Sequence, residues 1–466
     1  MPYFHYRTLA DLREDIAARG VAIDLESDLA RLGERVQVGP LAAANRMAVH
    51  PMEGCDGNPD GTPGELTFRR WRRFAEGGAA LLWGEATAVV AGARANPRQL
   101  TISSETARAL RRLLEETRAA RRARFGTADG LIAGMQLTHS GRWSHGAPIL
   151  AQHGRTIDSV RSFEGSALIS DDELEALEDK FVDAAALARD IGFDFVDIKQ
   201  CHTYLLNELL GARSRKGRYG GDFAGRTRFV RNVLGKIRAR LGDTIVLATR
   251  LNVYDGLPYA AGARGIGTPR EHDVPYCEGW GVDPDDPSRV DLSEPLQLIG
   301  ELRGLGLGLL NVSMGSPYYN AHIGRPFEKP PVDGYVPPEH PLDGVQRHVR
   351  LTAEVQRAFP DLPVVGSGYS WLRHFALNAG AANVAAGGVS FVGLGRGALA
   401  YPDFAADALE QGEMARDKAC IGVSYCTALM RAKHNELGQF ATGCVPRDKL
   451  YAAAFKDAQR AEGWRA

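Results

Sequence analysis

Three side chains that can donate or move a proton stand close together in this sequence. Lys199, His202 and Tyr204 directly follow the apolar run 195–198, which reads as a buried parallel strand. The apolar run 205–210 after them looks helical. Enzymes built from alternating strands and helices place their chemistry at the carboxyl ends of buried strands. The cluster therefore predicts an active site, whereas each residue alone is equally typical of a structural ion pair or a half-buried aromatic.

Two glycine-rich turns later in the chain predict a phosphate site. Gly366 and Gly368 stand in VVGSGYS, and Gly395 and Arg396 stand in FVGLGRG, each between a predicted strand and a predicted helix. Glycine lets backbone N–H groups approach an anion closely, and arginine can bind a phosphate through a forked pair of hydrogen bonds. Tight turns also require glycine, so one such turn is a weak signal. Two at neighbouring strand ends predict that a phosphate of a substrate or a cofactor lies beside the proton-donating cluster.

Length, charge and cysteine content narrow the class of protein. The chain has 466 residues, enough for one barrel with extensions or for roughly two or three ordinary domains. Its formal net charge of -1 predicts neither a nucleic-acid partner nor binding to an acidic membrane, and no apolar run has the length of a bilayer span. The N-terminal sequence lacks a secretory signal, and the six cysteines are too scattered for a disulfide framework. We expect a cytoplasmic protein that acts on a small molecule.

Eight apolar runs alternate with helical patterns and set the predicted fold. The runs of strand character are 47–52, 79–90, 130–139, 194–198, 244–251, 306–314, 362–367 and 389–395. The helical patterns are 68–75, 106–122, 170–191, 226–241, 295–303, 344–359 and 371–379. This alternation and count predict an α/β fold of the (β/α)₈ TIM-barrel type. An open doubly wound sheet is the alternative, disfavoured because no GxGxxG follows the first run.

Three regions lie outside the repeating pattern of the barrel. Residues 1–35 read as an N-terminal lead-in, 36–410 as the barrel and 411–466 as a C-terminal extension. Two long loops, 254–292 and 316–343, follow predicted barrel strands, so we expect them over the carboxyl-terminal mouth. Long loops there usually shape a substrate pocket or a lid, and a partner-binding or merely tolerated insertion is the alternative.

Seven motifs occur in an order that makes the chain resemble a known family. They are ANRMAVHPMEG, GEATAV, MQLTHSGR, VDIKQCHTYLLNELL, RYGGDFAGRTRF, VVGSG and FVGLGRGALAYPDF, and the match that they carry covers about 39–407. On these motifs the chain resembles the Old Yellow Enzyme superfamily of FMN-dependent NADH:flavin oxidoreductases and ene-reductases. The resemblance is closest to the branch related to 2,4-dienoyl-CoA reductase. It implies a barrel with FMN at its carboxyl-terminal mouth.

The resemblance also assigns residues to the FMN site. Gln136 matches the glutamine that hydrogen-bonds the pyrimidine end of the flavin, and Arg250 matches the arginine near its N1 and O2 edge. A cation there stabilises negative charge on the reduced flavin. The positions that match residues beside the flavin ring or around its phosphate are Pro51, Met52, Ala86, Gly366, Gly368, Gly395 and Arg396.

The activity that the resemblance implies is transfer of hydride from NAD(P)H through FMN to an activated C=C bond. The acceptor is an α,β-unsaturated carbonyl, acid or thioester, whose oxygen Lys199 and His202 polarise while Tyr204 protonates the α carbon. Lys199 replaces the usual histidine, and because lysine is a full cation we expect a preference for acidic or thioester-like acceptors. Glu53 is a second departure, since a carboxylate near the flavin disfavours its anionic reduced form unless it points away or pairs with Lys199.

The C-terminal segment resembles the iron–sulfur segment of the same branch, whose pattern is close to C-x2-C-x3-C-x11-C. Cys420, Cys426 and Cys444 remain, but Val423 stands where the second ligand belongs. A four-iron cluster normally requires four thiolates, so we favour a degenerate relic that packs the C-terminus over a cluster on the three cysteines. Because the sequence stops at Ala466, we expect no further FAD or nucleotide domain. Electrons then reach FMN directly from NADH or NADPH.

Two other functions stay open at this point. Lys199 at the end of a barrel strand could form a Schiff base in a lyase, with Tyr204 as the acid–base partner and the glycine turns holding a substrate phosphate. The chain could also bind flavin without turning over a substrate. The sequence leaves the oligomeric state open, with a homodimer as one option.

Overall fold

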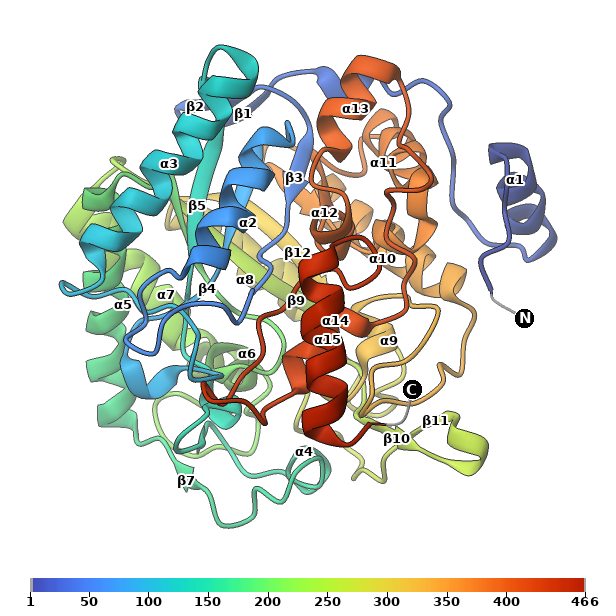
Figure 1. The fold of residues 1–466 in the computed structure, drawn as a ribbon. Helices are drawn as coiled ribbons and strands as arrows, with labels where there is room; N and C mark the ends of the chain where they lie inside the picture. The colour runs from blue at the N-terminus through green and yellow to red at the C-terminus, as the bar shows by residue number, and fades with distance from the viewer. Residues whose placement is uncertain (1–2, 465–466) are drawn as a thin grey trace.

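Eight parallel strands close into a barrel in the computed structural model, which describes residues 3–464 (Figure 1). The barrel strands are β3 (Met47–Val49), β4 (Leu81–Ala88), β5 (Ile132–Thr138), β8 (Phe195–Ile198), β9 (Val246–Tyr254), β12 (Leu307–Met314), β13 (Val364–Gly366) and β14 (Phe391–Leu394). Each pairs in parallel with the next, and β14 returns to β3. The predicted TIM barrel is confirmed, and the open sheet is wrong.

Alternate residues along a barrel strand face the interior and the outer helices, as the period of two requires. In β8, Phe195 belongs to the interior cluster, whereas Val196 and Ile198 belong to the large cluster under the helices. Asp197 also points inward, where it accepts a hydrogen bond from the indole of Trp83. The hairpin of β1 (Val36–Val38) and β2 (Leu41–Ala43) packs its apolar side chains on this interior cluster. Side chains therefore fill the barrel interior at one end, and the other end is left for a site.

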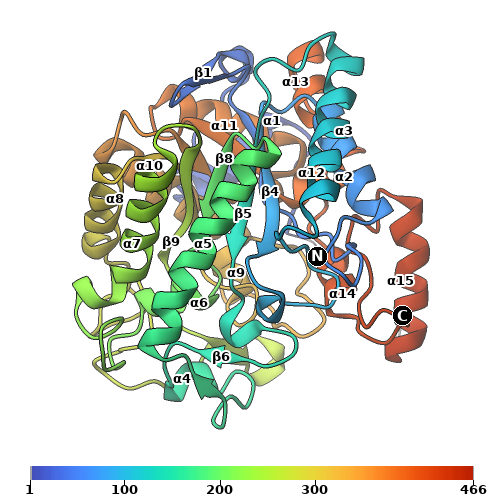
Figure 2. The ribbon, with the colours of Figure 1, turned by 90° about the vertical axis from the view of Figure 1, so that its left-hand side faces the viewer.

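Helices surround the barrel on its outside (Figure 2). Those of the repeating pattern are α2 (Glu65–Glu76), α3 (Ala107–Phe125), α5 (Asp171–Ile191), α7 (Phe223–Leu241), α8 (Ser293–Gly304), α10 (Pro341–Ala358), α11 (Ala376–Ala385), α12 (Arg396–Ala400) and α13 (Phe404–Gln411). The predicted start of α5 is confirmed, because Ser170 Oγ accepts from the Glu173 backbone N–H and the Glu173 carboxylate accepts from Ser170 N. Among the described residues, no helix combines the length and apolar character needed to cross a membrane.

One predicted helix differs in its first half. The segment Tyr369–Phe375 forms a 3₁₀ turn, and α11 begins only at Ala376. The reason is Arg373, whose φ of 55° is left-handed and interrupts an α-helix. Its guanidinium lies 4.2 Å from the ring centroid of Phe4, so the N-terminal lead-in packs at this point.

The connections and the two terminal segments carry further elements. They are α1 (Leu9–Ala18), α4 (Arg155–Asp158), α6 (Leu205–Leu210), α9 (Ala321–Gly324), α14 (Tyr425–Arg431), α15 (Lys449–Glu462), β6 (Ile149–Leu150), β7 (Ala167–Leu168), β10 (Tyr259–Ala261) and β11 (Gly267–Pro269). The last helix, α15, lies beside α2, where Asp448 accepts from Arg69 at 2.8 Å and from Arg73 at 2.9 Å (Figure 1). The domain boundaries after residues 35 and 410 stay a prediction.

The filled interior gives a stability prediction for Gly134 in β5. A Cβ on Gly134 would lie 2.3 Å from the ring atoms of Phe195, which are themselves fully buried. Gly134→Ala should lower the free energy of unfolding by about 1–3 kcal/mol, because the core has no room to relax. The measurement is urea unfolding followed by circular dichroism.

Gly235, inside α7, is the matched control because a Cβ there has no heavy atom within 4 Å. Gly235→Ala should raise the free energy of unfolding by about 0.5–1 kcal/mol through helix propensity. Equal effects of the two substitutions would contradict the packing that we describe.

Candidate active site

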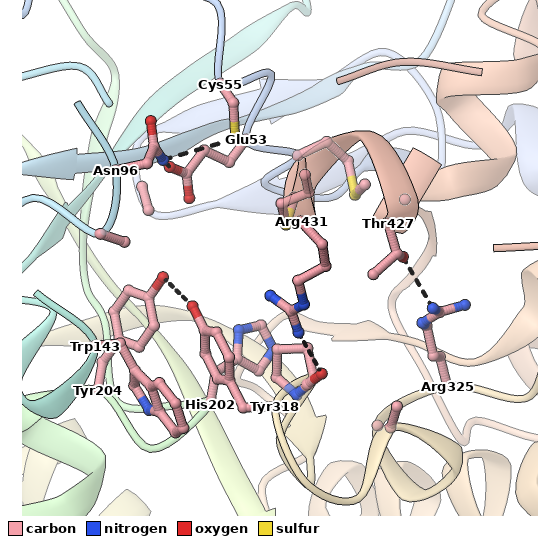
Figure 3. A pocket seen from close by; sticks show the side chains of 18 of the residues that line it. Glu53, Cys55, Asn96, Trp143, His202, Tyr204, Tyr318, Arg325, Thr427 and Arg431 are labelled. Carbon is pink, nitrogen blue, oxygen red and sulfur yellow. Dashed lines mark hydrogen bonds between the residues drawn. The ribbon is translucent and has the colours of Figure 1, made fainter. Parts of the chain in front are cut away.

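A cavity of about 800 Å³ opens at the carboxyl ends of the barrel strands (Figure 3). The structure brings almost all of the residues predicted for the site to this one cavity. The predicted residues that line it are Lys199, His202, Tyr204, Pro51, Met52, Ala86, Gln136, Arg250, Gly368, Gly395 and Arg396. Gly366 is not among the lining residues, and its carbonyl instead faces the Nε2 of His50 at 3.2 Å.

Asp197 is the buried anchor of the cavity floor. Its carboxylate accepts from Trp83 Nε1 at 2.7 Å, from Gln136 Nε2 at 2.6 Å and from the backbone N–H of Arg250 at 2.7 Å. Burial raises the pKa of Asp197, while these three donors favour the carboxylate. Because the amide nitrogen of Gln136 is committed to Asp197, its amide oxygen is left to accept a hydrogen bond from a ligand.

Arg250 supplies a cation to the same region of the cavity. Its backbone is held by Asp197, and its side chain lines the cavity. The buried Nε of Arg250 has no hydrogen-bond partner among residues 3–464. A buried guanidinium N–H without a partner is costly unless a ligand accepts from it. Arg250 is therefore a candidate to bind an oxygen or a basic nitrogen of a ligand.

Lys199 is a buried cation that faces an aromatic ring. Lys199 is 4 % exposed, and its Nζ lies 3.3 Å from the centroid of the Tyr204 ring. Burial lowers the pKa of Lys199 to about 8. No carboxylate of the described chain lies within ion-pair distance of this ammonium, which leaves it free to act on a ligand.

Glu53 does not pair with Lys199, one of the two arrangements that the sequence left open. Its Oε1 accepts a hydrogen bond from Asn96 Nδ2 instead, beside Cys55 (Figure 3). Burial raises the pKa of Glu53 to about 7, against the opposite pull of the Lys199 charge. The carboxyl group is therefore near its midpoint of ionisation at neutral pH.

The turn between β8 and Tyr204 is strained. His202 and Thr203 have φ values of 67° and 56°, in the left-handed region that residues other than glycine rarely adopt. Thr203 N donates to Asn207 Oδ1 at 2.6 Å, and Asn207 Nδ2 donates to Asp255 Oδ1 at 3.1 Å. This buried network holds the turn in place. Burial lowers the pKa of His202 well below its usual value, so the imidazole is neutral.

Tyr204 is flanked by aromatic residues that the sequence analysis missed. Its hydroxyl lies 3.0 Å from that of Tyr318, and the Tyr318 ring stacks on Trp143 at a centroid distance of 3.8 Å (Figure 3). Tyr318 stands in the long loop predicted over the mouth, so its region was expected although its role was not. Trp143 follows the motif MQLTHSGR, and no periodic signal marks it.

The glycine turns close the opposite end of the cavity. Gly368 has a φ of 92°, and a Cβ there would lie 2.6 Å from the Cβ of His348, so only glycine fits. Arg396 lines the cavity and forms no hydrogen bond or ion pair with the described residues. Burial lowers its pKa. A free guanidinium beside a glycine turn is suited to a phosphate.

The mouth is formed by one of the two long loops, by the C-terminal extension and by the connection 142–163 after β5. Tyr318, Arg325 and Asp333 of the loop 316–343 line the cavity. The loop 254–292 contributes none of the lining residues. Its Glu278 carboxylate instead accepts from the backbone of α4. The extension contributes the lining residues Thr427, Met430, Arg431, Lys433, Gln439, Glu462 and Trp464, a role that the sequence did not predict.

The three C-terminal cysteines face a separate small crevice. Cys420, Cys426 and Cys444 line it together with Val423 and Arg396. In the part of the chain that the structure describes, no three His, Cys, Asp or Glu side chains are spaced to hold a metal ion. The residues present therefore do not fit a four-iron cluster held by four thiolates.

Comparisons with known proteins agree with this geometry. The model of the NADH:flavin oxidoreductase / NADH oxidase family matches residues 32–262. The chain is 27% identical over 232 residues to the 4,4'-dithiodibutanoate disulfide reductase of Rhodococcus erythropolis, covering 48% of this chain and 54% of that protein. It is 31% identical over 198 residues to the NADPH dehydrogenase of Bacillus pumilus, covering 41% and 55%. The chain thus spans about half the length of these relatives.

Solved structures share the fold. An Old Yellow Enzyme homologue from Zymomonas mobilis superposes with a TM-score of 0.59 at 19% identity, over 83% of this chain and 94% of that one. A 2-naphthoyl-CoA reductase in complex with 2-naphthoyl-CoA gives a TM-score of 0.65 at 16% identity, over 92% and 58%. At these low sequence identities, the superpositions show a shared fold only.

The ionisation of Glu53 and Lys199 gives a pH prediction. As pH rises, Glu53 gains a negative charge near pH 7 and Lys199 loses a positive charge near pH 8. Both changes make the cavity more negative, so the affinity for an anion such as benzoate should fall about tenfold or more from about pH 6 to about pH 9. Isothermal titration calorimetry at constant ionic strength measures it.

Two variants separate the contributions. Glu53→Gln should remove the part of the decrease centred near pH 7, and Lys199→Gln the part centred near pH 8. If both variants keep the full decrease in affinity of the wild type, neither group controls the charge of the cavity.

Proposed function

We propose that the chain, whose residues 32–262 match the model of the NADH:flavin oxidoreductase / NADH oxidase family, is an FMN-dependent oxidoreductase. It passes hydride from NADH or NADPH to an alkene conjugated to a carbonyl, carboxyl or thioester group. The observation that supports this most is the pair of groups tied to Asp197: the amide oxygen of Gln136, and the guanidinium of Arg250, whose Nε has no partner among the described residues. The closer resemblance to the 2,4-dienoyl-CoA reductase branch stays a prediction.

The residues of the cavity fit FMN. The pyrimidine edge of a flavin carries an N–H group and carbonyl oxygens, which the Gln136 oxygen and the Arg250 guanidinium complement. At the other end, Gly368 and Arg396 suit a phosphate. When bound, FMN supplies two-electron redox chemistry.

Lys199 and His202 bind the oxygen of the acceptor. Lys199 offers an ammonium below about pH 8 and has no acidic partner in the described chain. His202 is neutral, so one of its ring nitrogens donates and the other accepts. Donors aimed at an oxygen on which negative charge develops stabilise the transition state. The acceptor carbonyl is thereby polarised without transfer of a full proton.

Tyr204 supplies a proton to the α carbon of the acceptor. Burial raises its pKa well above the usual value, so the hydroxyl stays protonated at neutral pH. The hydroxyl of Tyr318, 3.0 Å away, holds it in one orientation and is placed to return a proton to it. The cation of Lys199 over the Tyr204 ring stabilises any negative charge that develops on its oxygen.

A lyase is the second candidate, because the lowered pKa of Lys199 favours the neutral amine that a Schiff base requires. Borohydride trapping with glycolaldehyde phosphate, followed by mass spectrometry, tests it. An adduct at Lys199 would support the lyase, and its absence with several aldehydes would remove that candidate.

We also propose a cellular location and an oligomeric state. All six cysteines are free thiols, which supports a reducing cytoplasm. The acceptor is a small molecule, and a homodimer is the assembly that light scattering would test first.

The proposed function predicts a flavin spectrum that responds to nicotinamides. The purified protein, supplied with FMN, should show flavin absorption that bleaches on anaerobic addition of NADH or NADPH and returns when a conjugated enone is added. A bound flavin that neither nicotinamide reduces would indicate the non-catalytic alternative. Failure to bind FMN would contradict the proposal.

The role of Tyr204 predicts a selective defect. Tyr204→Phe should slow reoxidation by the enone by about 100-fold or more, because general acid catalysis of this kind contributes that much. Reduction by NADH or NADPH should stay within about twofold of the wild type, since no proton passes through Tyr204 in that half-reaction. Stopped-flow absorption measures both half-reactions.

Tyr219→Phe is the control, because Tyr219 is equally buried and bonds only Glu178, outside the cavity. Both half-reactions should be unchanged in it. Reoxidation of Tyr204→Phe at the wild-type rate would assign the proton to another donor.

A further inference from the structure

One arginine at the mouth of the cavity has no acidic partner. Arg161 lies in the connection between α4 and β7 and is one of the residues that line the cavity. Its guanidinium is 5.1 Å from the ring centroid of Trp143 and 5.9 Å from that of Tyr318. Within residues 3–464 it forms neither a hydrogen bond nor an ion pair. Among the described residues, its guanidinium lies over the faces of two aromatic rings, which leave its N–H groups free.

A second arginine on the same wall, Arg431, forms an ion pair with an acidic residue, unlike Arg161. Arg431 lies 5.0 Å from the Tyr318 ring, donates to Asp333 at 2.8 Å and donates to the carbonyl of Pro317 at 3.0 Å (Figure 3). Arg161 has no such partner in the described chain and is an exposed residue, although partial desolvation of its guanidinium and the charge of Arg431 lower its pKa. Arg325 and Lys433 at the mouth also lack an acidic partner in the described chain, but they donate to the neutral oxygens of Ser424, Thr427 and Gln439. Of these cations, Arg161 is the one without any hydrogen bond to the described residues.

None of the acidic residues of the lining lies within ion-pair distance of Arg161. Glu53 is bonded to Asn96, and Asp333 is bonded to Arg431. Glu462 accepts from the imidazole and backbone of His434. An anion that enters the cavity thus meets a free cation at the mouth and no free carboxylate beside it.

A continuous aromatic wall joins this cation to the inner site. Lys199 lies over the ring of Tyr204, whose centroid is 6.2 Å from that of Tyr318. Tyr318 stacks on Trp143 with an interplanar angle of 9°, and Arg161 lies over Trp143. The wall has a cation at each end and flat apolar faces between them. Such a surface suits a flat molecule with an oxygen at one end and an anion at the other.

We propose that Arg161 binds an oxyanion, a carboxylate or a phosphate, at the end of the acceptor remote from its reacting double bond. This inference rests on the proposed function and names its substrate class: flat conjugated acceptors that carry a negatively charged tail. The guanidinium supplies two parallel N–H donors, and the aromatic faces beneath it reduce its hydration, which strengthens the contact. A charge-assisted pair of this kind should be worth about tenfold in affinity.

The test compares acceptors that differ only in the tail. The probes are 4-phenyl-3-buten-2-ones with a para carboxylate, carboxamide or phosphate, attached directly or through one methylene. Their binding to the FMN-loaded protein is measured by titration calorimetry without NAD(P)H, so that turnover is not needed. The wild type should bind the best carboxylate or phosphate about tenfold or more tightly than the matching carboxamide. Preference for carboxylate or for phosphate identifies the source of the anion.

Variants then assign the preference to Arg161. Arg161→Gln should reduce the ratio of affinities to about one, and Arg161→Lys should keep part of it because the charge remains. Arg155→Gln is the control, since Arg155 on the neighbouring α4 pairs with Glu271 and Asp273 and does not line the cavity. It should keep the wild-type preference.

The outcomes separate this inference from the proposed function. A wild type that does not distinguish anionic from neutral tails, or a preference that survives in Arg161→Gln, would overturn the inference even if every enone is reduced. A preference that depends on Arg161, combined with no reduction of any acceptor by NADH or NADPH, would support the anion site and contradict the proposed function.

Discussion

The active end of the barrel depends on one buried carboxylate. Asp197 reaches from β8 to an indole on β4, an amide on β5 and a backbone N–H on β9. A buried carboxylate is costly unless its oxygens are saturated with donors, and here three donors converge on it. The hydrogen bonds to Asp197 fix the orientation of the Gln136 amide and the position of the Arg250 backbone. The groups available to a ligand at this end are therefore set by a contact that does not itself face the ligand.

A second polar network performs the same task at the mouth. Asp255 accepts from Asn207, from Asn252 at 2.7 Å and from the backbone of Trp280 at 3.0 Å. Asn207 in turn holds the strained turn before Tyr204 through the backbone N–H of Thr203. Local strain persists only where surrounding contacts over-determine it, and it is concentrated at sites of function. The proton donor of the proposed reaction is thus positioned by the nearby Asn207, which Asp255 in a distant loop holds in place.

The sequence predicts the barrel well because parallel strands buried on both faces leave continuous apolar runs. Most of the residues predicted for the site line the cavity. Lys199 could be predicted because polar residues at the carboxyl ends of barrel strands meet at one rim, whereas Arg250 was assigned through the resemblance to a family. The sequence misses Trp143 and Arg161, which lie in a connection without periodicity, and it misses the contribution of Arg431 from the extension. Their places follow from tertiary packing, which no local pattern records. The helix predicted from Trp371 fails for a similar reason, since the left-handed Arg373 packs on Phe4 near the other end of the chain.

The most direct measurement of the central claim is the dissociation constant of FMN in the wild type and in Asp197→Asn, from quenching of flavin fluorescence. An asparagine has one oxygen where the carboxylate has two, so its NH₂ group must face either the backbone N–H of Arg250 or the donors of Trp83 and Gln136, and a donor on that side loses its acceptor. If Asp197 orients the cofactor site, a folded variant should bind FMN at least about tenfold more weakly, since it leaves a buried polar group unpaired. An unchanged dissociation constant in a variant with a native melting profile would contradict the account.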